Sequence, residues 1–237
     1  MLDPQITTVL FDLDGTLLPM ELEKFTNTYF GLLAKKAAPF GFQPEPLGAA
    51  VWKGTKAMVK NDGTETNDKR FWDTFAGEMG EEVLQLRPVF DGFYANEFHG
   101  AKAACGENPL ARRAIDGLKA KGYDVILATN PIFPLVGVET RLSWVGLRPE
   151  DFSYITAYEN STTCKPNPAY YAEILRKTGK RPQECLMVGN DATEDTAALE
   201  QGIGVYLVTD CLLNPKGRDI SGVPQGTFAA FLEFAGV

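Results

Sequence analysis

The sequence is poor in the side chains that many enzymes use as nucleophiles, bases and metal ligands. It has one histidine, His99, and four cysteines with no CxxC pair. A single histidine cannot by itself support histidine-based nucleophilic or metal chemistry. There is no GxSxG nucleophile elbow and no P-loop, and the segment GNDATED lacks the glycines of a dinucleotide fingerprint. These absences argue against a serine-hydrolase, nucleotide-binding or histidine-metal site.

Long apolar segments are also missing. No apolar run approaches the roughly 20 residues that a membrane-spanning helix needs. The chain begins with MLDPQITTVLFDLDG, in which no basic region precedes a signal-type apolar stretch. Cys185 lies in the apolar run ECLMVG, where a buried thiol is favoured over a disulfide. We therefore expect a soluble protein of the reducing cytoplasm, with no membrane partner.

Basic residues are outnumbered by acidic ones. The chain has 31 aspartates and glutamates against 23 lysines and arginines, which gives a net charge of −8. Nucleic acids and anionic membrane surfaces are bound through basic faces, so we expect neither as a main partner. If the substrate is an anion, the protein must supply positive charge locally.

The chain does contain a regular alternation of strands and helices. Buried strands are predicted at residues 7–11, 123–130, 185–190 and 205–209, and a weaker one at 154–156. Helices are predicted between them and after them, at 108–122, 135–145, 166–179, 193–202 and 226–236. This alternation predicts an α/β fold whose core is a Rossmann-like parallel sheet with right-handed crossovers.

One long segment interrupts the alternation after the first strand. From about residue 20 to residue 100, apolar residues recur at spacings of three and four, which predicts four or five helices and no strand. We expect an inserted, all-helical cap domain over residues 18–100, and a discontinuous core formed by residues 1–17 and 101–237. Most of the insertion's aromatic residues at helical spacing are predicted to be core. They are Phe25, Tyr29, Phe30, Trp52, Phe71, Trp72, Phe75, Phe90 and Tyr94.

Polar side chains gather where the predicted strands end. In open α/β sheets, ligands bind outside the carboxyl ends of the strands, so these positions are informative. The candidates are two aspartates after the first strand, a threonine and asparagine after the second, a lysine in the loop CKPNP, and two aspartates after the strand LMVG. In chain order they are Asp12, Asp14, Thr129, Asn130, Lys165, Asp191 and Asp195.

Carboxylates at one strand edge repel one another, and burying them unpaired is costly. One lysine cannot neutralise four of them, whereas a hard divalent cation can. All-oxygen ligation with retained water is what Mg²⁺ prefers, so the sequence predicts Mg²⁺ as cofactor. Such an ion would also let an anionic phosphate approach an acidic pocket. Asp12 and Asp14, two apart in an extended segment, can face one phosphorus atom.

These residues carry a resemblance to a known family. FDLDGTL, ATN, the lysine of CKPNP, and VGNDATED resemble the four ordered motifs of the haloacid dehalogenase (HAD) superfamily. The likeness covers the whole chain, because members with a type-1 cap have a helical insertion between the first and second motifs. It implies that Asp12 is a nucleophile that forms an aspartyl-phosphate and that Asp14 is the general acid and base.

The resemblance assigns the remaining positions as well. Thr129, Asn130 and Lys165 would bind the substrate phosphate, and Lys165 would also orient the nucleophile. Mg²⁺ would be held by the Asp12 carboxylate, the Asp14 backbone carbonyl and Asp191, with Asp195 in support.

The resemblance also narrows the reaction. The dehalogenating branch lacks the second aspartate, because a departing halide needs no proton, whereas this chain has Asp14. The favoured function is therefore Mg²⁺-dependent hydrolysis of a small-molecule phosphate monoester. The alternatives are phosphoryl transfer to a second hydroxyl, as in a phosphomutase, and a non-catalytic phosphate-binding or regulatory module. A receiver-type signalling module would need neither the DxDGT turn nor the insertion. The sequence does not indicate an oligomeric state.

Each candidate also has a purely structural interpretation. Asp12 and Asp14 could form a turn before Gly15, and Asp191 with Glu194 fits a helix-capping pattern. Thr129 could be an ordinary strand residue, and a lone lysine is usually solvated. One shared site explains all of these positions together, whereas the structural interpretations need several independent coincidences.

Overall fold

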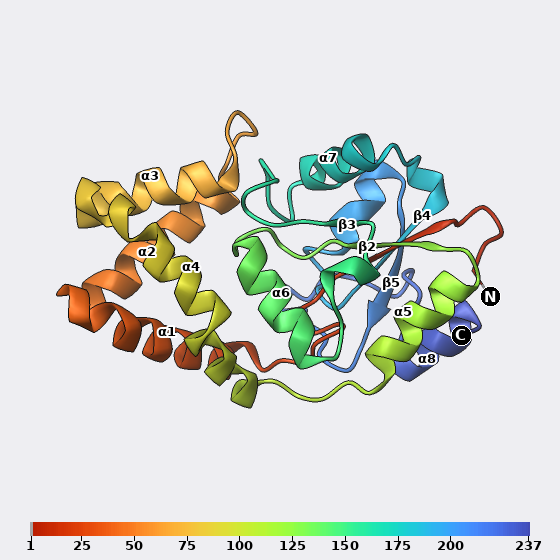
Figure 1. The fold of residues 1–237 in the computed structure, drawn as a ribbon. Helices are drawn as coiled ribbons and strands as arrows, with labels where there is room; N and C mark the ends of the chain where they lie inside the picture. Colours follow the sequence, from red (N-terminus) through yellow and green to blue (C-terminus); the bar gives the residue numbers. More distant parts are fainter. Residues whose placement is uncertain (1) are drawn as a thin grey trace.

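The computed structural model describes residues 2–237, which form a six-stranded sheet with helices on both faces (Figure 1). The strand order is β3-β2-β1-β4-β5-β6, and every pair of neighbours is parallel. The strands are β1 (Thr8–Phe11), β2 (Asp124–Leu127), β3 (Tyr154–Ile155), β4 (Cys185–Gly189), β5 (Gly204–Val208) and β6 (Gln225–Gly226). The predicted α/β fold with a Rossmann-like parallel sheet is confirmed.

The apolar run of β1 explains why this strand lies inside the sheet. All of its residues are buried, and successive side chains point to opposite faces. Val9 and Phe11 join one hydrophobic cluster, whereas Leu10 joins the other. Helices α5 (Leu110–Ala120) and α8 (Phe228–Ala235) contribute to the first cluster, and α7 (Pro168–Thr178) contributes to the second. A near-continuous apolar sequence is typical of a strand covered on both faces.

The segment between β1 and α5 is helical, as predicted. Its elements are α1 (Leu22–Ala37), η1 (Ala38–Phe40), α2 (Pro44–Val59), α3 (Asn67–Met79), η2 (Glu81–Leu86), α4 (Arg87–Ala95) and η3 (Glu97–Ala104), where η denotes a 3-10 helix. Figure 1 shows these helices beside the sheet and its covering helices, and α4 and η3 pack against α6 (Leu135–Trp144). The division into a cap over 18–100 and a core over 1–17 and 101–237 stays a prediction.

The predicted helix at residues 193–202 differs in type from the other predicted helices of the core. Residues 193–202 form turns followed by the 3-10 helix η6 (Thr196–Gln201), not an α-helix. The Asp191 side chain accepts hydrogen bonds from the backbone N–H groups of Thr193 and Glu194, which holds this segment in a tight turn. The remaining 3-10 helices are η4 (Pro149–Asp151) and η5 (Pro182–Glu184).

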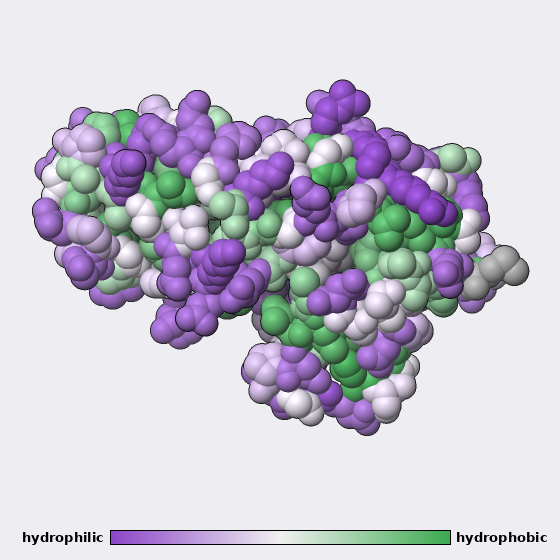
Figure 2. Space-filling model, turned by 90° about the horizontal axis from the view of Figure 1, so that it is seen from below, coloured by the Kyte–Doolittle hydropathy of each residue, from purple (hydrophilic) through white to green (hydrophobic). Residues whose placement is uncertain are grey.

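Polar residues make up much of the surface that Figure 2 shows. Seen from below, hydrophilic residues cover much of the molecule and apolar residues lie between them (Figure 2). Within residues 2–237, no helix combines the length and apolarity needed to cross a membrane.

Candidate active site

Asp12 and Asp14 lie on the loop that follows β1, at the carboxyl edge of the sheet. The backbone N–H of Asp12 donates to the carbonyl of Val188 on β4 at 2.9 Å, so the loop begins alongside the neighbouring strand. Gly15 then turns the chain with a φ of +90°, and its N–H donates to the Leu18 carbonyl at 2.7 Å. A Cβ atom at this glycine would lie 2.2 Å from Nδ2 of Asn190. Glycine is therefore required here by both backbone conformation and space.

Lys165 forms hydrogen bonds both to the aspartate that follows β1 and to an aspartate in the segment after β4. Its Nζ donates to Oδ1 of Asp12 at 2.9 Å and to Oδ1 of Asp195 at 2.7 Å, and the residue is only 1% exposed. Burial would lower the pKa of this ammonium, but the two carboxylates outweigh that effect and raise its pKa well above the usual value. Burial raises the pKa of Asp12 to about 7, an effect that Lys165 opposes. Lys165 is thus a buried cation that bridges two acidic side chains.

The loop after β4 places Asp191 and Asp195. The backbone N–H of Asp191 donates to Oδ2 of Asp195 at 2.9 Å, while the other oxygen of Asp195 accepts from Lys165. Oδ1 of Asp191 accepts from the N–H groups of Thr193 and Glu194 at 2.6 and 2.9 Å. Both bonds go to Oδ1, so the capping interaction leaves the second oxygen of this carboxylate available to a ligand.

Thr129 and Asn130 follow β2, which is the other neighbour of β1. Thr129 is buried, and its backbone carbonyl accepts hydrogen bonds from Thr156 and Tyr170 at 2.7 and 2.9 Å. The Asn130 amide donates to Glu194 at 3.0 Å, whereas its Oδ1 is buried without a partner among the described residues. All seven candidates therefore lie on the loops that follow β1, β2 and β4 and on the loop before α7, which brings Lys165 onto Asp12.

Arg141 is a site residue that the sequence analysis missed. This fully buried arginine on α6 forms an ion pair with the Asp14 carboxylate. Its Nε donates to the Gly137 carbonyl at 3.2 Å, and its guanidinium carbon lies 4.3 Å from the centre of the Phe133 ring. Its Nη2 and Oδ1 of Asp14 are both buried without a partner within residues 2–237. Arg141 is thus a second buried cation, besides Lys165, paired with one of the candidate aspartates.

The donor set suits a hard cation. The predicted ligands are the Asp12 carboxylate, the Asp14 carbonyl and the Asp191 carboxylate, all of them oxygen atoms on two adjacent strand ends, as Mg²⁺ prefers. Across the described part of the chain, no three histidine, cysteine, aspartate or glutamate side chains gather in ligand geometry. The predicted site needs only two carboxylates, because its third protein donor is a backbone carbonyl and water completes the shell. The residues present therefore fit the ion.

An aromatic pocket adjoins the site. All nine aromatic residues singled out in the insertion line one pocket, together with Phe133, Tyr158 and Asp14. The prediction that most of these rings are core therefore needs refinement, because their shared face surrounds a cavity. His99 lies on η3, where its Nδ1 accepts a hydrogen bond from Trp144 at 3.2 Å.

Comparison with known proteins decides the family. A family model described as haloacid dehalogenase-like hydrolase matches residues 6–202. The chain belongs to this family. The predicted membership of the HAD superfamily is thus confirmed, and so is the prediction that the protein is a hydrolytic enzyme.

Curated relatives that resemble the chain are named as phosphatases or as a pyrophosphatase. Pyrophosphatase PpaX of Bacillus velezensis is 23% identical over 202 residues, which cover 85% of this chain and 82% of the relative. A phosphoglycolate phosphatase of Shigella dysenteriae is 26% identical over 208 residues, covering 83% and 79%. A glyceraldehyde 3-phosphate phosphatase of Methanothermobacter thermautotrophicus is 26% identical over 208 residues, covering 86% and 85%.

Solved structures share the fold across both branches of the family. A predicted phosphoglycolate phosphatase from Haemophilus somnus superposes with a TM-score of 0.59 at 20% identity, covering 98% of both chains. A 2-haloacid dehalogenase from Pseudomonas syringae pv. tomato superposes with a TM-score of 0.60 at 18% identity, also covering 98% of both chains. At such low identity these matches establish the fold and do not separate the two activities.

Proposed function

We propose that this HAD-family protein is a Mg²⁺-dependent phosphatase that hydrolyses a small-molecule phosphate monoester through an aspartyl-phosphate on Asp12. The observation that carries the proposal is the buried bridge from Lys165 to Asp12 and Asp195. It fixes one oxygen of Asp12 and leaves the other for attack on phosphorus. The names of two relatives, a phosphoglycolate phosphatase and a glyceraldehyde 3-phosphate phosphatase, support hydrolysis of a small phosphorylated compound.

In the first half-reaction, the free oxygen of Asp12 attacks phosphorus and the bond from phosphorus to the ester oxygen breaks. Asp14 gives its proton to the departing oxygen, so the leaving group departs as an alcohol. In the second half-reaction, Asp14 takes a proton from water as the water attacks phosphorus. Inorganic phosphate departs and Asp12 is regenerated. The presence of Asp14 supports phosphate chemistry over dehalogenation, because only the former needs this proton.

The other site residues bind and orient the phosphate. Thr129, Asn130 and Lys165 are assigned as donors to its oxygens. Asp12, the Asp14 carbonyl and Asp191 are assigned as ligands of Mg²⁺, and Asp195 supports them through its bonds to Lys165 and to the Asp191 backbone. When bound, the ion would neutralise negative charge on the transferring phosphoryl group.

The helical segment 18–100 is assigned as a cap. Its packing on α6 through α4 and η3 puts its aromatic residues next to Asp14. A cap in this position would exclude water from the first half-reaction and contact the leaving group.

The test is Asp12→Asn, assayed with p-nitrophenyl phosphate and Mg²⁺. We expect a loss of several orders of magnitude in kcat, because the amide cannot act as the nucleophile, in a protein that stays folded and still unfolds cooperatively on heating. Asp116→Asn, at an exposed aspartate on α5, is the matched control and should retain activity. Near-normal turnover by Asp12→Asn would refute the proposal. With a sugar phosphate as substrate, an isomerised sugar phosphate in place of inorganic phosphate would identify a phosphomutase.

A further inference from the structure

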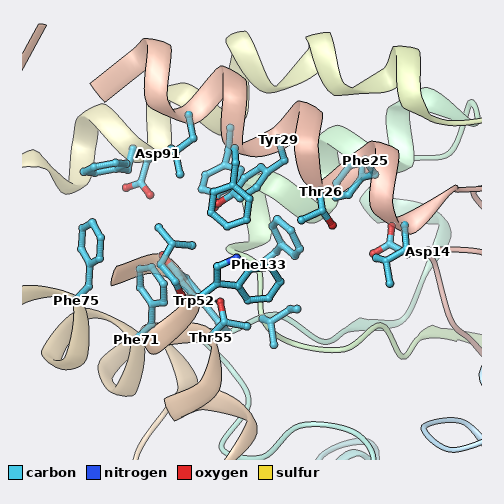
Figure 3. Close-up of a pocket in the computed structure, with 18 of the residues that line it drawn as sticks. Asp14, Phe25, Thr26, Tyr29, Trp52, Thr55, Phe71, Phe75, Asp91 and Phe133 are labelled. Atoms are coloured by element: carbon cyan, nitrogen blue, oxygen red, sulfur yellow. Dashed lines mark hydrogen bonds between the residues drawn. The ribbon is translucent and has the colours of Figure 1, made fainter. Parts of the chain in front are cut away.

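The aromatic pocket is connected to the reacting centre. Asp14, assigned above as the acid that protonates the leaving oxygen, is itself a lining residue. In Figure 3, Asp14 lies at one end of the pocket and Asp91 at the other, with Phe25, Tyr29 and Phe133 between them. The part of a substrate that is bonded to the ester oxygen would therefore extend into this pocket.

The charge of the pocket restricts what it can hold. Asp14 and Asp91 are the only charged residues among those that line it, and no lysine, arginine or histidine lines it. Arg141 is fully buried and is not among the lining residues, and it pairs with Asp14 through Nη1. A carboxylate or second phosphate on the leaving group would lose its hydration without gaining a cationic partner, which is strongly unfavourable. The pocket therefore selects against phosphate monoesters whose leaving group carries an anionic group of its own.

The size of the pocket restricts the occupant further. Its volume is about 140 Å³. An apolar cavity of about 150 Å³ in another protein stays dry and binds benzene, so the volume here suits one ring. Two glycines leave room for aromatic rings that line the pocket. A Cβ at Gly54 would lie 2.6 Å from the Phe71 ring, and a Cβ at Gly137 would lie 2.9 Å from the Tyr94 ring. The rings thus occupy space that other residues at these two positions would take.

We propose that the substrate is a phosphate monoester whose leaving group is a ring-sized, apolar body without a second negative charge. This inference rests on the proposed phosphatase function and specifies its substrate class. The leaving group would lie among the aromatic side chains of α1–α4 while its oxygen faces Asp14. This class differs from phosphoglycolate, for which some relatives are named, because phosphoglycolate is small and carries a carboxylate.

The first test compares wild-type kcat/KM for benzyl phosphate, ethyl phosphate and phosphoglycolate. All three release alkyl alcohols, so differences in leaving-group acidity are small. We expect benzyl phosphate to be preferred by at least about 10-fold, the lower limit for a single extra methylene in an apolar pocket. Equal or better turnover of ethyl phosphate or phosphoglycolate would overturn the inference.

The second test places a larger side chain in the pocket. Thr55 lines the wall that α2 contributes, and its hydroxyl donates to the Val51 carbonyl at 2.9 Å (Figure 3). Thr28 on α1 makes the same type of bond, to the Lys24 carbonyl at 2.8 Å, but does not line the pocket. Thr55→Phe should lower kcat/KM for benzyl phosphate at least about 10-fold more than for ethyl phosphate. Thr28→Phe should leave that ratio unchanged.

The outcomes separate the two proposals. A uniform effect of Thr55→Phe on both esters would overturn the substrate class while leaving the phosphatase assignment intact. If Thr55→Phe fails to fold, the wild-type preference still decides. If no ester is hydrolysed in an Asp12-dependent manner, the proposed function itself is refuted, and this inference with it.

Discussion

Replacing Lys165 by methionine tests whether the charge bridge holds the site together. The lysine is 1% exposed and donates to two buried carboxylates, at 2.9 and 2.7 Å. Methionine fills a similar volume but leaves Asp12 and Asp195 without their cation. Removing one partner of a buried ion pair costs about 3–5 kcal/mol in the free energy of unfolding. We expect a loss in this range, measured by urea unfolding in buffer without divalent cations.

The control is Lys53→Met. Lys53 pairs with Glu78 at 2.6 Å, but the two side chains are 57% and 39% exposed, and such pairs contribute only about 0–1 kcal/mol. Comparing the two variants therefore tests whether burial of the ion pair causes the larger loss in the free energy of unfolding. A loss for Lys165→Met no larger than that for Lys53→Met would refute the reasoning.

The destabilisation should also depend on pH. The pKa of Asp12 is already raised to about 7 by burial, and Lys165 lowers it, so the variant's pKa should be higher still. A folded-state pKa above the unfolded value means that the folded state binds the additional proton. Stability is then retained at low pH and lost as the pH rises through the folded-state pKa. The defect of Lys165→Met should be larger near pH 8 than near pH 5, and a pH-independent defect would contradict the account.

Three further substitutions test separate parts of the site. Asp191→Ala should raise the Mg²⁺ concentration needed for half-maximal activity, and an unchanged metal titration would count against ligation there. Arg141→Met should lower kcat for ethyl phosphate much more than for p-nitrophenyl phosphate. Nitrophenolate departs with little help from a general acid, whereas ethanol needs the proton of Asp14, which Arg141 positions. Equal losses for the two esters would assign Arg141 a structural role only. Gly189→Ala should destabilise the fold by about 1–3 kcal/mol in a melting experiment, because its Cβ would lie 2.1 Å from Oδ2 of Asp195. Gly31→Ala, with nothing within 4 Å of the added Cβ, is its control and should not destabilise the protein.

The positions of the candidate site residues in the fold were predictable, because parallel strands bring their carboxyl ends to one edge of the sheet. Asp12, Thr129 and Asp191 are far apart in the chain, yet they follow three adjacent strands. Residues that directly follow adjacent parallel strands are therefore expected to lie near one another, however far apart they are in the chain. Arg141 lacks this signal, because it lies within the helix after β2 and reaches the site only through the way α6 packs. The segment VETRLSW around it mixes polar and apolar residues, so the sequence pattern did not indicate that this arginine is buried.

The aromatic residues illustrate a second limit of sequence patterns. A spacing of three and four indicates which face of a helix is covered, and this was correct for residues such as Phe25 and Phe75. The pattern does not indicate whether facing helices close completely or leave a cavity between them. That depends on the approach of the helices, which small residues such as Gly54 permit. The pattern also did not indicate that the predicted helix at residues 193–202 would contain the 3-10 helix η6.

The most direct test of the account is to identify the phosphorylated residue during turnover. Wild-type protein and Asp14→Asn would be mixed with p-nitrophenyl phosphate and Mg²⁺, quenched in acid, digested and analysed by mass spectrometry. We expect one phosphoryl group on the peptide that contains Asp12, with more of it in Asp14→Asn because the water step lacks its base. Turnover with no phosphoryl group on Asp12, or with one on another residue, would contradict it.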